Sequence, residues 1–139
     1  MSEFRHIEEV AIRFGDLDTL GHVNNASYVQ YLEEARGGYY DEVVGVPFET
    51  LDTVVVELNV VYTDEITRGQ RVEVAVRVPE LGRSSVPMEY EIRATDPETG
   101  ETTVAATAET VQVNTDRETG SSVPIPDAWR TAISEWEGL

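Results

Sequence analysis

The stretch RFGDLDTLGHVNNASYVQYLEEAR, residues 13–36, joins an apolar strand pattern to an amphipathic helix pattern. Between these two patterns it gathers two acids, a glycine, a histidine and two adjacent asparagines. Functional groups are often found on such segments, because a loop held by rigid elements can direct polar groups at a ligand. This loop is therefore the first candidate for a functional site.

Individual residues of the loop have physical consequences. Asp16 and Asp18 are separated by one residue, so in an extended segment their carboxylates lie on the same side. Gly21 permits a tight or left-handed turn. Asn24 and Asn25 stand just before the helical pattern, where a side-chain oxygen can cap the helix and backbone N–H groups remain free. A carboxylate facing free donors at a helix start is a candidate site for acyl transfer.

The run Asp-Leu-Asp-x-x-Gly-His-Val-Asn-Asn-x-x-Tyr, residues 16–28, resembles the signature of hot-dog-fold acyl thioesterases. The most similar pattern is that of the hydroxybenzoyl-CoA thioesterase type, and plant acyl-ACP thioesterases carry a related motif. The resemblance covers most of the chain, because the downstream strand order also fits. It implies an acyl-CoA thioesterase that converts a thioester and water into a carboxylic acid and free CoA, without a metal or redox cofactor.

The resemblance also implies roles for single residues. Asp18 matches the acid that attacks the thioester or activates the attacking water. The backbone N–H of Asn25 matches the donor that polarises the thioester carbonyl, with help from the helix dipole. His22 and Asn24 are expected to shape the catalytic loop, and His22 either acts in the site or only packs there. Asp16 is expected to be structural.

Glu33 and Glu34 compete with Asp18 for the catalytic role, because a second hot-dog thioesterase lineage takes its carboxylate from the central helix. Neither glutamate falls on the apolar stripe of the helix pattern. A solvated or interface role is therefore the preferred interpretation of both.

Metal sites and two related machineries fit the loop poorly. A calcium loop beginning at Asp16 would need oxygen ligands where Leu20 and Ser27 stand. A zinc site built from Asp18 and His22 lacks a third ligand. A hot-dog hydratase would show the pattern Asp-x-Asn-Pro-x-His, which is absent here. Leu20 also replaces an asparagine of the plant acyl-ACP enzymes, which argues against their asparagine–histidine machinery.

A second candidate ligand segment precedes a later strand, at a position resembling the CoA-contacting turn of the family. It consists of Gly82, Arg83, Ser84 and Ser85. The forked donors of arginine suit phosphate, and serine hydroxyls add further contacts. An ordinary polar turn is the alternative. Arg68 and Arg71 are weaker candidates on the same grounds.

The pattern of the whole chain predicts one α+β domain over residues 1–139. Strands are predicted at residues 7–14, 53–63, 72–78, 86–92 and 103–114, with a bulge in the last one near Glu109. A long helix is predicted from residue 26 to about 43 and a short one after Pro126. Short turns between consecutive strands imply an antiparallel sheet, and it must cover the long helix. This is the hot-dog arrangement of about five strands around one central helix.

Two glycines, Gly37 and Gly38, lie inside the predicted long helix. Each costs roughly 1 kcal/mol of helix stability relative to alanine. They indicate either close packing at this point or an early end of the helix.

Composition restricts the partners and the environment. The net charge is −17, all ten basic residues are arginine, and cysteine is absent. Nucleic acid is excluded as a partner because phosphate binding needs a basic surface. An acidic surface without lysine is typical of salt-loving organisms, where salt screens self-repulsion. The chain has no apolar signal segment or membrane span, so a cytoplasmic location is expected.

The resemblance further implies an acyl-CoA or acyl-ACP substrate, and a homodimer or homotetramer with its sites at the subunit interface. A non-hydrolytic acyl-CoA or acyl-carrier binding protein on the same fold is the leading alternative. The intact Asp18 disfavours that alternative.

Overall fold

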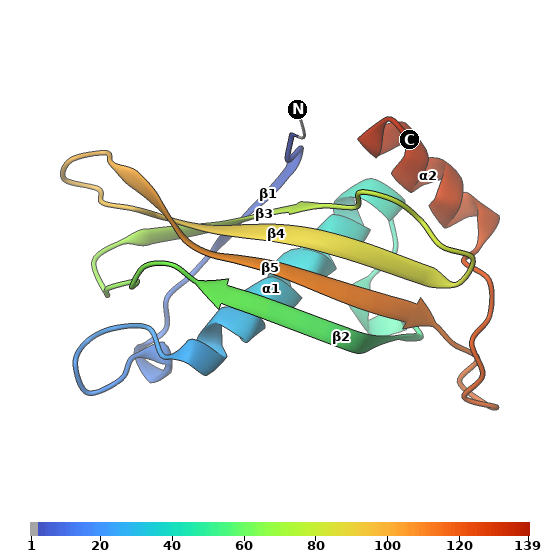
Figure 1. The fold of residues 1–139 in the computed structure, drawn as a ribbon, viewed down its shortest axis with the longest axis horizontal. Coiled ribbons are helices and arrows are strands. Elements are labelled where there is room, and N and C mark those ends of the chain that lie inside the picture. The colour runs from blue at the N-terminus through green and yellow to red at the C-terminus, as the bar shows by residue number, and fades with distance from the viewer. Residues whose placement is uncertain (1–2) are drawn as a thin grey trace.

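The computed structural model describes residues 3–139, in which one long helix lies against a single sheet (Figure 1). The strands are β1 (His6–Val10), β2 (Thr53–Tyr62), β3 (Arg71–Arg77), β4 (Ser85–Thr95) and β5 (Thr102–Asn114). They form one antiparallel sheet in the order β1-β3-β4-β5-β2. The long helix is α1 (Asn25–Tyr39), and a second helix, α2 (Asp127–Glu137), follows β5. The predicted α+β hot-dog architecture is confirmed.

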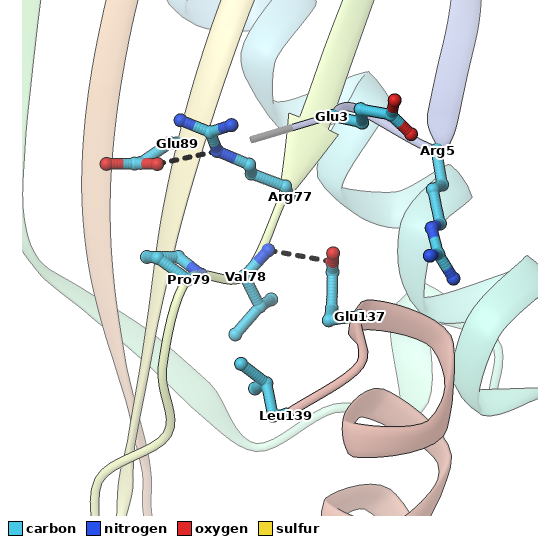
Figure 2. Close-up of a pocket in the computed structure, with 8 residues that line it drawn as sticks. All are labelled: Glu3, Arg5, Arg77, Val78, Pro79, Glu89, Glu137 and Leu139. Carbon is cyan, nitrogen blue, oxygen red and sulfur yellow. Dashed lines mark hydrogen bonds and ion pairs between the residues drawn. The ribbon is translucent and has the colours of Figure 1, made fainter. Parts of the chain in front are cut away.

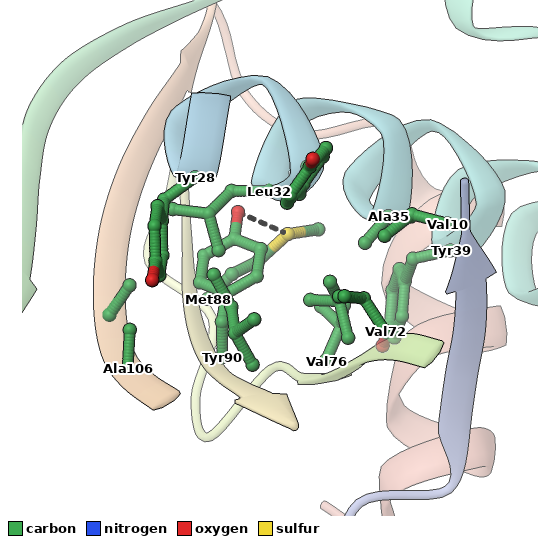
Figure 3. Close-up of a cluster of buried hydrophobic side chains, with 14 of the residues drawn as sticks. Val10, Tyr28, Leu32, Ala35, Tyr39, Val72, Val76, Met88, Tyr90 and Ala106 are labelled. Carbon is green, nitrogen blue, oxygen red and sulfur yellow. Dashed lines mark hydrogen bonds between the residues drawn. The ribbon is translucent and has the colours of Figure 1, made fainter. Parts of the chain in front are cut away.

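The hydrophobic core lies between α1 and the inner face of the sheet (Figure 3). Tyr28, Leu32, Ala35 and Tyr39 are buried at helical spacing along one side of α1. They face alternate residues of the strands, which explains the period of two in the strand sequences. Complete burial of each large apolar side chain contributes about 1.5–3 kcal/mol to folding. This packing fixes the position of α1, and with it the loop that precedes α1.

The two glycines of the long helix lie at close contacts. A Cβ atom on Gly38 would overlap the carboxylate of Glu8, which approaches the helix from β1. A Cβ atom on Gly37 would lie 3.2 Å from the ring of Phe48. The close-packing interpretation is therefore confirmed. The chain continues beyond α1 as a π-helical turn (Tyr40–Val44).

Some details of the strands differ from the sequence prediction. The first strand ends at Val10 rather than at residue 14, and Phe14–Asp16 form a 3₁₀ turn with Phe14 exposed. The bulge of β5 lies at Ala105 instead of near Glu109. The Ala105 carbonyl accepts hydrogen bonds from the N–H groups of both Thr63 and Asp64, so the bulge forms where the chain leaves β2.

β2 is an edge strand, because β5 is its single neighbour in the sheet. A second bulge shifts its register between Val55 and Glu57, so the predicted alternation is wrong at the start of β2. Cross-strand pairs share a face of the sheet, which places Val55 on the inner face opposite the buried Gln112. The exposed apolar side chains of β2 are Val54, Val55, Val56, Leu58, Val61 and Tyr62.

The last turn of α2 is hydrogen-bonded to the rest of the fold (Figure 2). A Glu137 carboxylate oxygen accepts hydrogen bonds from the Tyr39 hydroxyl at 2.7 Å and from the Val78 N–H at 2.8 Å. Burial and the nearby Glu137 carboxylate raise the pKa of Tyr39, so this hydroxyl remains a donor. The short terminal helix predicted after Pro126 is confirmed. Within residues 3–139, no helix combines the length and apolarity that a membrane crossing requires.

Candidate active site

The loop before α1 folds into a narrow turn over residues 18–22. The Asp18 N–H donates to the His22 carbonyl at 2.8 Å, and the Gly21 N–H donates to the Asp18 carbonyl at 3.1 Å. Gly21 has a φ of 79°, a left-handed conformation that favours glycine. A bridge between Leu17 and Val23 closes the base of the turn. The turn therefore presents the Asp18 side chain at a fixed point on the surface.

The Asp18 carboxylate is exposed, and one of its oxygens is already bound. Its Oδ1 atom accepts hydrogen bonds from the Leu20 N–H at 2.8 Å and from the His22 N–H at 3.1 Å. These donors, His22 first and then Leu20, hold the pKa of Asp18 below its ordinary value of 3.8. The side chain is consequently ionised at neutral pH, and within residues 3–139 nothing donates to its Oδ2 atom.

Asp16, two residues earlier, is buried and serves the structure of the loop. Its carboxylate accepts hydrogen bonds from the Tyr31 hydroxyl at 2.7 Å and from the Arg13 N–H at 2.9 Å. The Ser27 hydroxyl lies at 3.5 Å from the other oxygen. Burial and the bond to Asp16 raise the pKa of Tyr31. The two acids of the motif therefore have different environments, as expected from the sequence.

The start of α1 is capped by Asn24. The Asn24 side-chain oxygen accepts a hydrogen bond from the Ser27 N–H at 3.1 Å, and its amide donates to the Asp16 carbonyl at 3.0 Å. Asn25 is the first residue of α1, so its N–H has no acceptor within the helix. No other group of residues 3–139 accepts from this N–H either. The Asn25 N–H, which has no acceptor in this part of the chain, thus lines the same cavity as the ionised Asp18 carboxylate.

A cavity of about 320 Å³ joins these groups to the end of β2. Asp18, His22 and Asn25 line one side, and residues 62–65 line the other. The His22 ring lies 3.5 Å from the Glu65 carboxylate. The cavity contains the carboxylates of Asp18, Asp64 and Glu65, so it is electronegative and has no arginine in its lining.

Residues 62–65 were not identified from the sequence. In the sequence, Tyr62 has the pattern of an apolar strand residue, and Asp64 and Glu65 have the pattern of an ordinary polar turn. They reach the cavity because the end of β2 passes the start of α1, a contact between residues about 40 positions apart. No local signal in the sequence reports such a contact.

Glu33 and Glu34 lie outside this cavity. They line a separate open groove on the outer side of α1, together with Arg13, Gln30, Gly37 and Phe48. Glu33 is 3.9 Å from the guanidinium of the buried Arg36. The two groups of candidate carboxylates therefore lie in different hollows of the surface.

The segment Gly82, Arg83, Ser84 and Ser85 forms the turn before β4 and lies at the opposite end of the sheet (Figure 1). β4 has 11 residues, so its length of roughly 35 Å separates this turn from the Asp18 end within one chain. Arg130 supports the turn by donating to the Gly82 carbonyl at 2.9 Å. The Arg83 side chain is exposed and makes no ion pair within residues 3–139.

The two weaker arginine candidates have different surroundings. Arg71 is paired with Glu9 at 2.8 Å on the outer side of the sheet. Arg68 belongs to the turn after β2, next to the bridge between His22 and Thr67. Of these two arginines, Arg68 therefore lies next to the segment that pairs with the Asp18 loop.

Comparisons with known proteins were made for the whole chain. The sequence model of the thioesterase-like superfamily matches residues 12–133. A thioesterase from Thermus thermophilus, whose crystal structure is complexed with coenzyme A and Zn, is 38% identical, with a TM-score of 0.84 over 100% of this chain and 98% of that one. A DHNA-CoA thioesterase from Staphylococcus aureus is 25% identical, with a TM-score of 0.81 over 96% and 91% of the two chains.

The YsmA protein of Bacillus subtilis (strain 168) is a more distant relative. It is 26% identical over 91 residues, which are 64% of this chain and 61% of that protein. The match therefore spans about three fifths of the length of this curated relative.

The crystal structure of the Thermus protein contains zinc. Within residues 3–139, no three His, Cys, Asp or Glu side chains come together as a metal site. At the candidate site, the His22 ring and the Glu65 carboxylate lie 3.5 Å apart, and no third side chain of this kind joins them as a metal site in the described part of the chain.

Proposed function

Because the chain belongs to the thioesterase-like superfamily, we propose that it hydrolyses acyl-CoA thioesters at the cavity beside Asp18. The observation that carries this proposal is the pairing of an ionised carboxylate with a free N–H at the start of α1. Thioester hydrolysis needs both, because one group must attack or activate water while another stabilises the negative oxygen that forms.

The reaction consumes one water molecule and breaks the bond between the acyl carbon and sulfur. Asp18 either attacks the acyl carbon itself, giving an anhydride that water then cleaves, or takes a proton from the attacking water. In both routes the N–H of Asn25 donates to the carbonyl oxygen as it becomes negative, aided by the dipole of α1. The sulfur leaves as free CoA, and the acyl group leaves as a carboxylic acid.

The edge of β2 supports a homodimer as the working unit. A long apolar edge strand is rarely left uncovered in a folded protein. Antiparallel pairing of β2 with the same strand of a second copy would satisfy the open backbone groups and cover the exposed valines. A homotetramer would then be a pair of such dimers.

This pairing also gives the turn at Arg83 a function. When two β2 strands pair in antiparallel fashion, the end of one sheet that carries Asp18 lies beside the end of the other sheet that carries Arg83. The β4 strand of the partner would lie three strand spacings, about 14 Å, from β2. Within one chain, the length of β4, about 35 Å, separates the Arg83 turn from the Asp18 end. We propose that Gly82, Arg83, Ser84 and Ser85 of one subunit bind the nucleotide phosphates of a CoA whose thioester lies beside Asp18 of the other. The phosphates then remain outside the electronegative cavity.

The substitution Asp18→Asn tests the chemistry. We expect turnover of acyl-CoA esters to fall by a factor of roughly 10² to 10⁴, while CoA binding and the thermal midpoint stay unchanged. Asparagine keeps the size and one acceptor oxygen, but it neither attacks nor takes a proton. Glu33→Gln and Glu34→Gln are the matched controls on α1. If Asp18→Asn remains active while one of the glutamate variants is inactive, the reacting carboxylate is on α1 and the assignment of Asp18 is wrong.

The same assay addresses the non-hydrolytic alternative. A panel of acyl-CoA esters of increasing chain length, with acyl-ACP for comparison, is tested on the native protein. Tight binding of an ester without release of free thiol would show a binding protein instead of an enzyme.

Subunit mixing tests the shared site. Asp18→Asn and Arg83→Ala proteins are unfolded together, refolded and assayed far below the KM for CoA esters. A mixed dimer holds one doubly defective site and one intact site if each site uses both subunits. Random mixing should then restore roughly a quarter of the native activity. If Arg83 served Asp18 of its own subunit, the mixed dimer would contain no intact site and activity would stay low.

A further inference from the structure

Tyr62 makes a contact at the candidate site that the catalytic proposal does not use. It is the last residue of β2, and its hydroxyl donates a hydrogen bond to the Asn25 carbonyl at 2.8 Å. It lines the same cavity as Asp18. The end of the edge strand is therefore tied directly to the first residue of the helix that supplies the free N–H.

The ring of Tyr62 is also held in place. It packs edge-to-face against the ring of Tyr28, with 4.9 Å between the ring centroids and 78° between the planes. Tyr28 is buried in the core, and its own hydroxyl donates to the Asp64 carbonyl at 3.3 Å. An aromatic pair of this geometry contributes about 0.5–1.5 kcal/mol beyond the area it buries. The Tyr62 hydroxyl is thus delivered to Asn25 by a rigid side chain.

The backbone around Asn25 is then fixed from both sides. On one side, the N–H and the side-chain amide of Asn24 both donate to the Asp16 carbonyl, at 2.8 Å and 3.0 Å. On the other side, Tyr62 binds the Asn25 carbonyl. The first turn of a helix has few bonds of its own and is the part most prone to fray. External bonds on both flanks therefore determine the direction of the Asn25 N–H.

The hydroxyl of Tyr62 has a single proton, and that proton is engaged by the Asn25 carbonyl. It is therefore not free to donate to the substrate oxygen or to the leaving sulfur. This separates a positioning function from a direct role as an acid or an oxyanion donor.

We propose that Tyr62 is a positioning residue for the reaction, which acts by holding the Asn25 carbonyl, in the peptide unit next to the one that carries the Asn25 N–H, so that this N–H stays directed at the reacting carbonyl. The proposal rests on the proposed thioesterase function. A displacement of a donor by a fraction of an ångström weakens a bond made in the transition state more than it weakens substrate binding. The effect of losing the hydroxyl should consequently appear in kcat.

The test compares Tyr62→Phe with Tyr40→Phe. Tyr62→Phe keeps the ring and removes the hydroxyl. Tyr40→Phe removes a buried hydroxyl that has no hydrogen-bond partner within residues 3–139, far from the cavity. We expect Tyr62→Phe to lower kcat roughly 10-fold, less than the loss of a whole oxyanion donor, with KM changed by less than about twofold. Tyr40→Phe should retain native kcat and KM.

The pH profile separates positioning from acid catalysis. A positioning effect lowers kcat by the same factor at every pH and leaves the shape of the profile unchanged. Loss of the alkaline limb in Tyr62→Phe would overturn the proposal and make the hydroxyl a proton donor. An unchanged kcat would overturn it as well.

Amide hydrogen exchange gives a readout that does not depend on activity. Tyr62→Phe should accelerate exchange at the Ser27 N–H, which donates to the Asn24 side-chain oxygen at the start of α1, while Tyr40→Phe leaves this rate unchanged. Native exchange rates in Tyr62→Phe would overturn the positioning role even if the protein proves to be a thioesterase. If the native protein shows no turnover but exchange is faster in Tyr62→Phe, the proposed thioesterase function is wrong. The hydrogen bond from Tyr62 would then still be shown to stabilise the start of α1.

Discussion

At the scale of single residues, the loop separates two carboxylates that are chemically identical. Asp16 is 5% exposed and receives several donors, whereas the Asp18 side chain is open to solvent and keeps one oxygen free. Burial with full hydrogen bonding makes a carboxylate part of the framework. Exposure beside a free donor makes it available for chemistry. The two positions should therefore respond to substitution in opposite ways.

Asp16→Ala should reduce the free energy of unfolding by about 2–3 kcal/mol, because it leaves the buried Tyr31 hydroxyl without its acceptor. Chemical denaturation of Asp16→Ala and Asp18→Asn in parallel checks this expectation. Asp18→Asn should unfold at the same denaturant concentration as the native protein. A stable Asp16→Ala protein would show that other groups hold the loop.

The motif residues could be identified from the sequence because they are neighbours along the chain. Asp18, His22, Asn24 and Asn25 fall within one short loop, and the structure places them around one helix start. Tyr62 gave no signal, because a tyrosine at the end of an alternating strand has the same pattern whether or not its hydroxyl reaches a helix. Contacts between distant segments depend on the fold, which local patterns do not contain.

At the scale of elements, the last turn of α2 is held by one carboxylate. Glu137 links α2 to the Tyr39 hydroxyl of α1 and to the Val78 N–H at the end of β3. At its other end α2 is bound through Arg130, which donates to the Gly82 carbonyl, and Trp129, Ile133 and Trp136 supply apolar contacts. Glu137 is the polar contact that fixes the last turn of α2 against α1 and β3.

Glu137→Ala should lower the free energy of unfolding by about 1–3 kcal/mol, because the buried Tyr39 hydroxyl loses its acceptor. Glu135→Ala, at an exposed position of the same helix, is the matched control and should change stability by less than about 0.5 kcal/mol. Urea denaturation of both variants measures the difference. Equal losses would mean that apolar packing alone holds α2.

The element boundaries show where sequence patterns lose information. The order of strands and the long helix followed from alternation and helical spacing, and both are confirmed. The bulge in β2 was missed because residues 54–56 are three valines, which have the same hydropathy on either face of a strand. The sequence also could not show that the turn at Arg83 lies far from Asp18, since that distance depends on how the strands are ordered in the sheet.

At the scale of the whole molecule, charge is the dominant property. The chain carries 27 acids and ten arginines. Several arginines are already paired, such as Arg77 with Glu89 of the neighbouring strand at 2.7 Å and Arg93 with Glu91 of the same strand at 2.8 Å. Most carboxylates consequently have no cationic partner and repel one another. A dimer doubles the charge of one particle, so assembly should be the first property to fail when screening is weak.

Thermal stability and particle mass should therefore both rise as sodium or potassium chloride increases from low to molar concentration. Screening is largely complete near 1 M, where the Debye length is about 3 Å. A further rise above that concentration would indicate ion binding or salting-out of apolar surface. Thermal unfolding combined with light scattering measures both quantities. A midpoint and mass that stay constant across the series would show that the acidity is not an adaptation to salt.

The open edge of β2 has a consequence for a newly synthesised chain. Before the proposed dimer forms, each chain presents an edge strand of ten residues with mostly apolar side chains, whose backbone can pair with another extended segment and begin a cross-β ladder. Glu57 is the single charged residue of this strand and opposes such stacking. A dimer closes after two chains, whereas a ladder adds another −17 with every chain that joins it. The acidity that should weaken the proposed dimer in dilute salt should therefore also limit fibril growth, and so favour the dimer over a growing ladder.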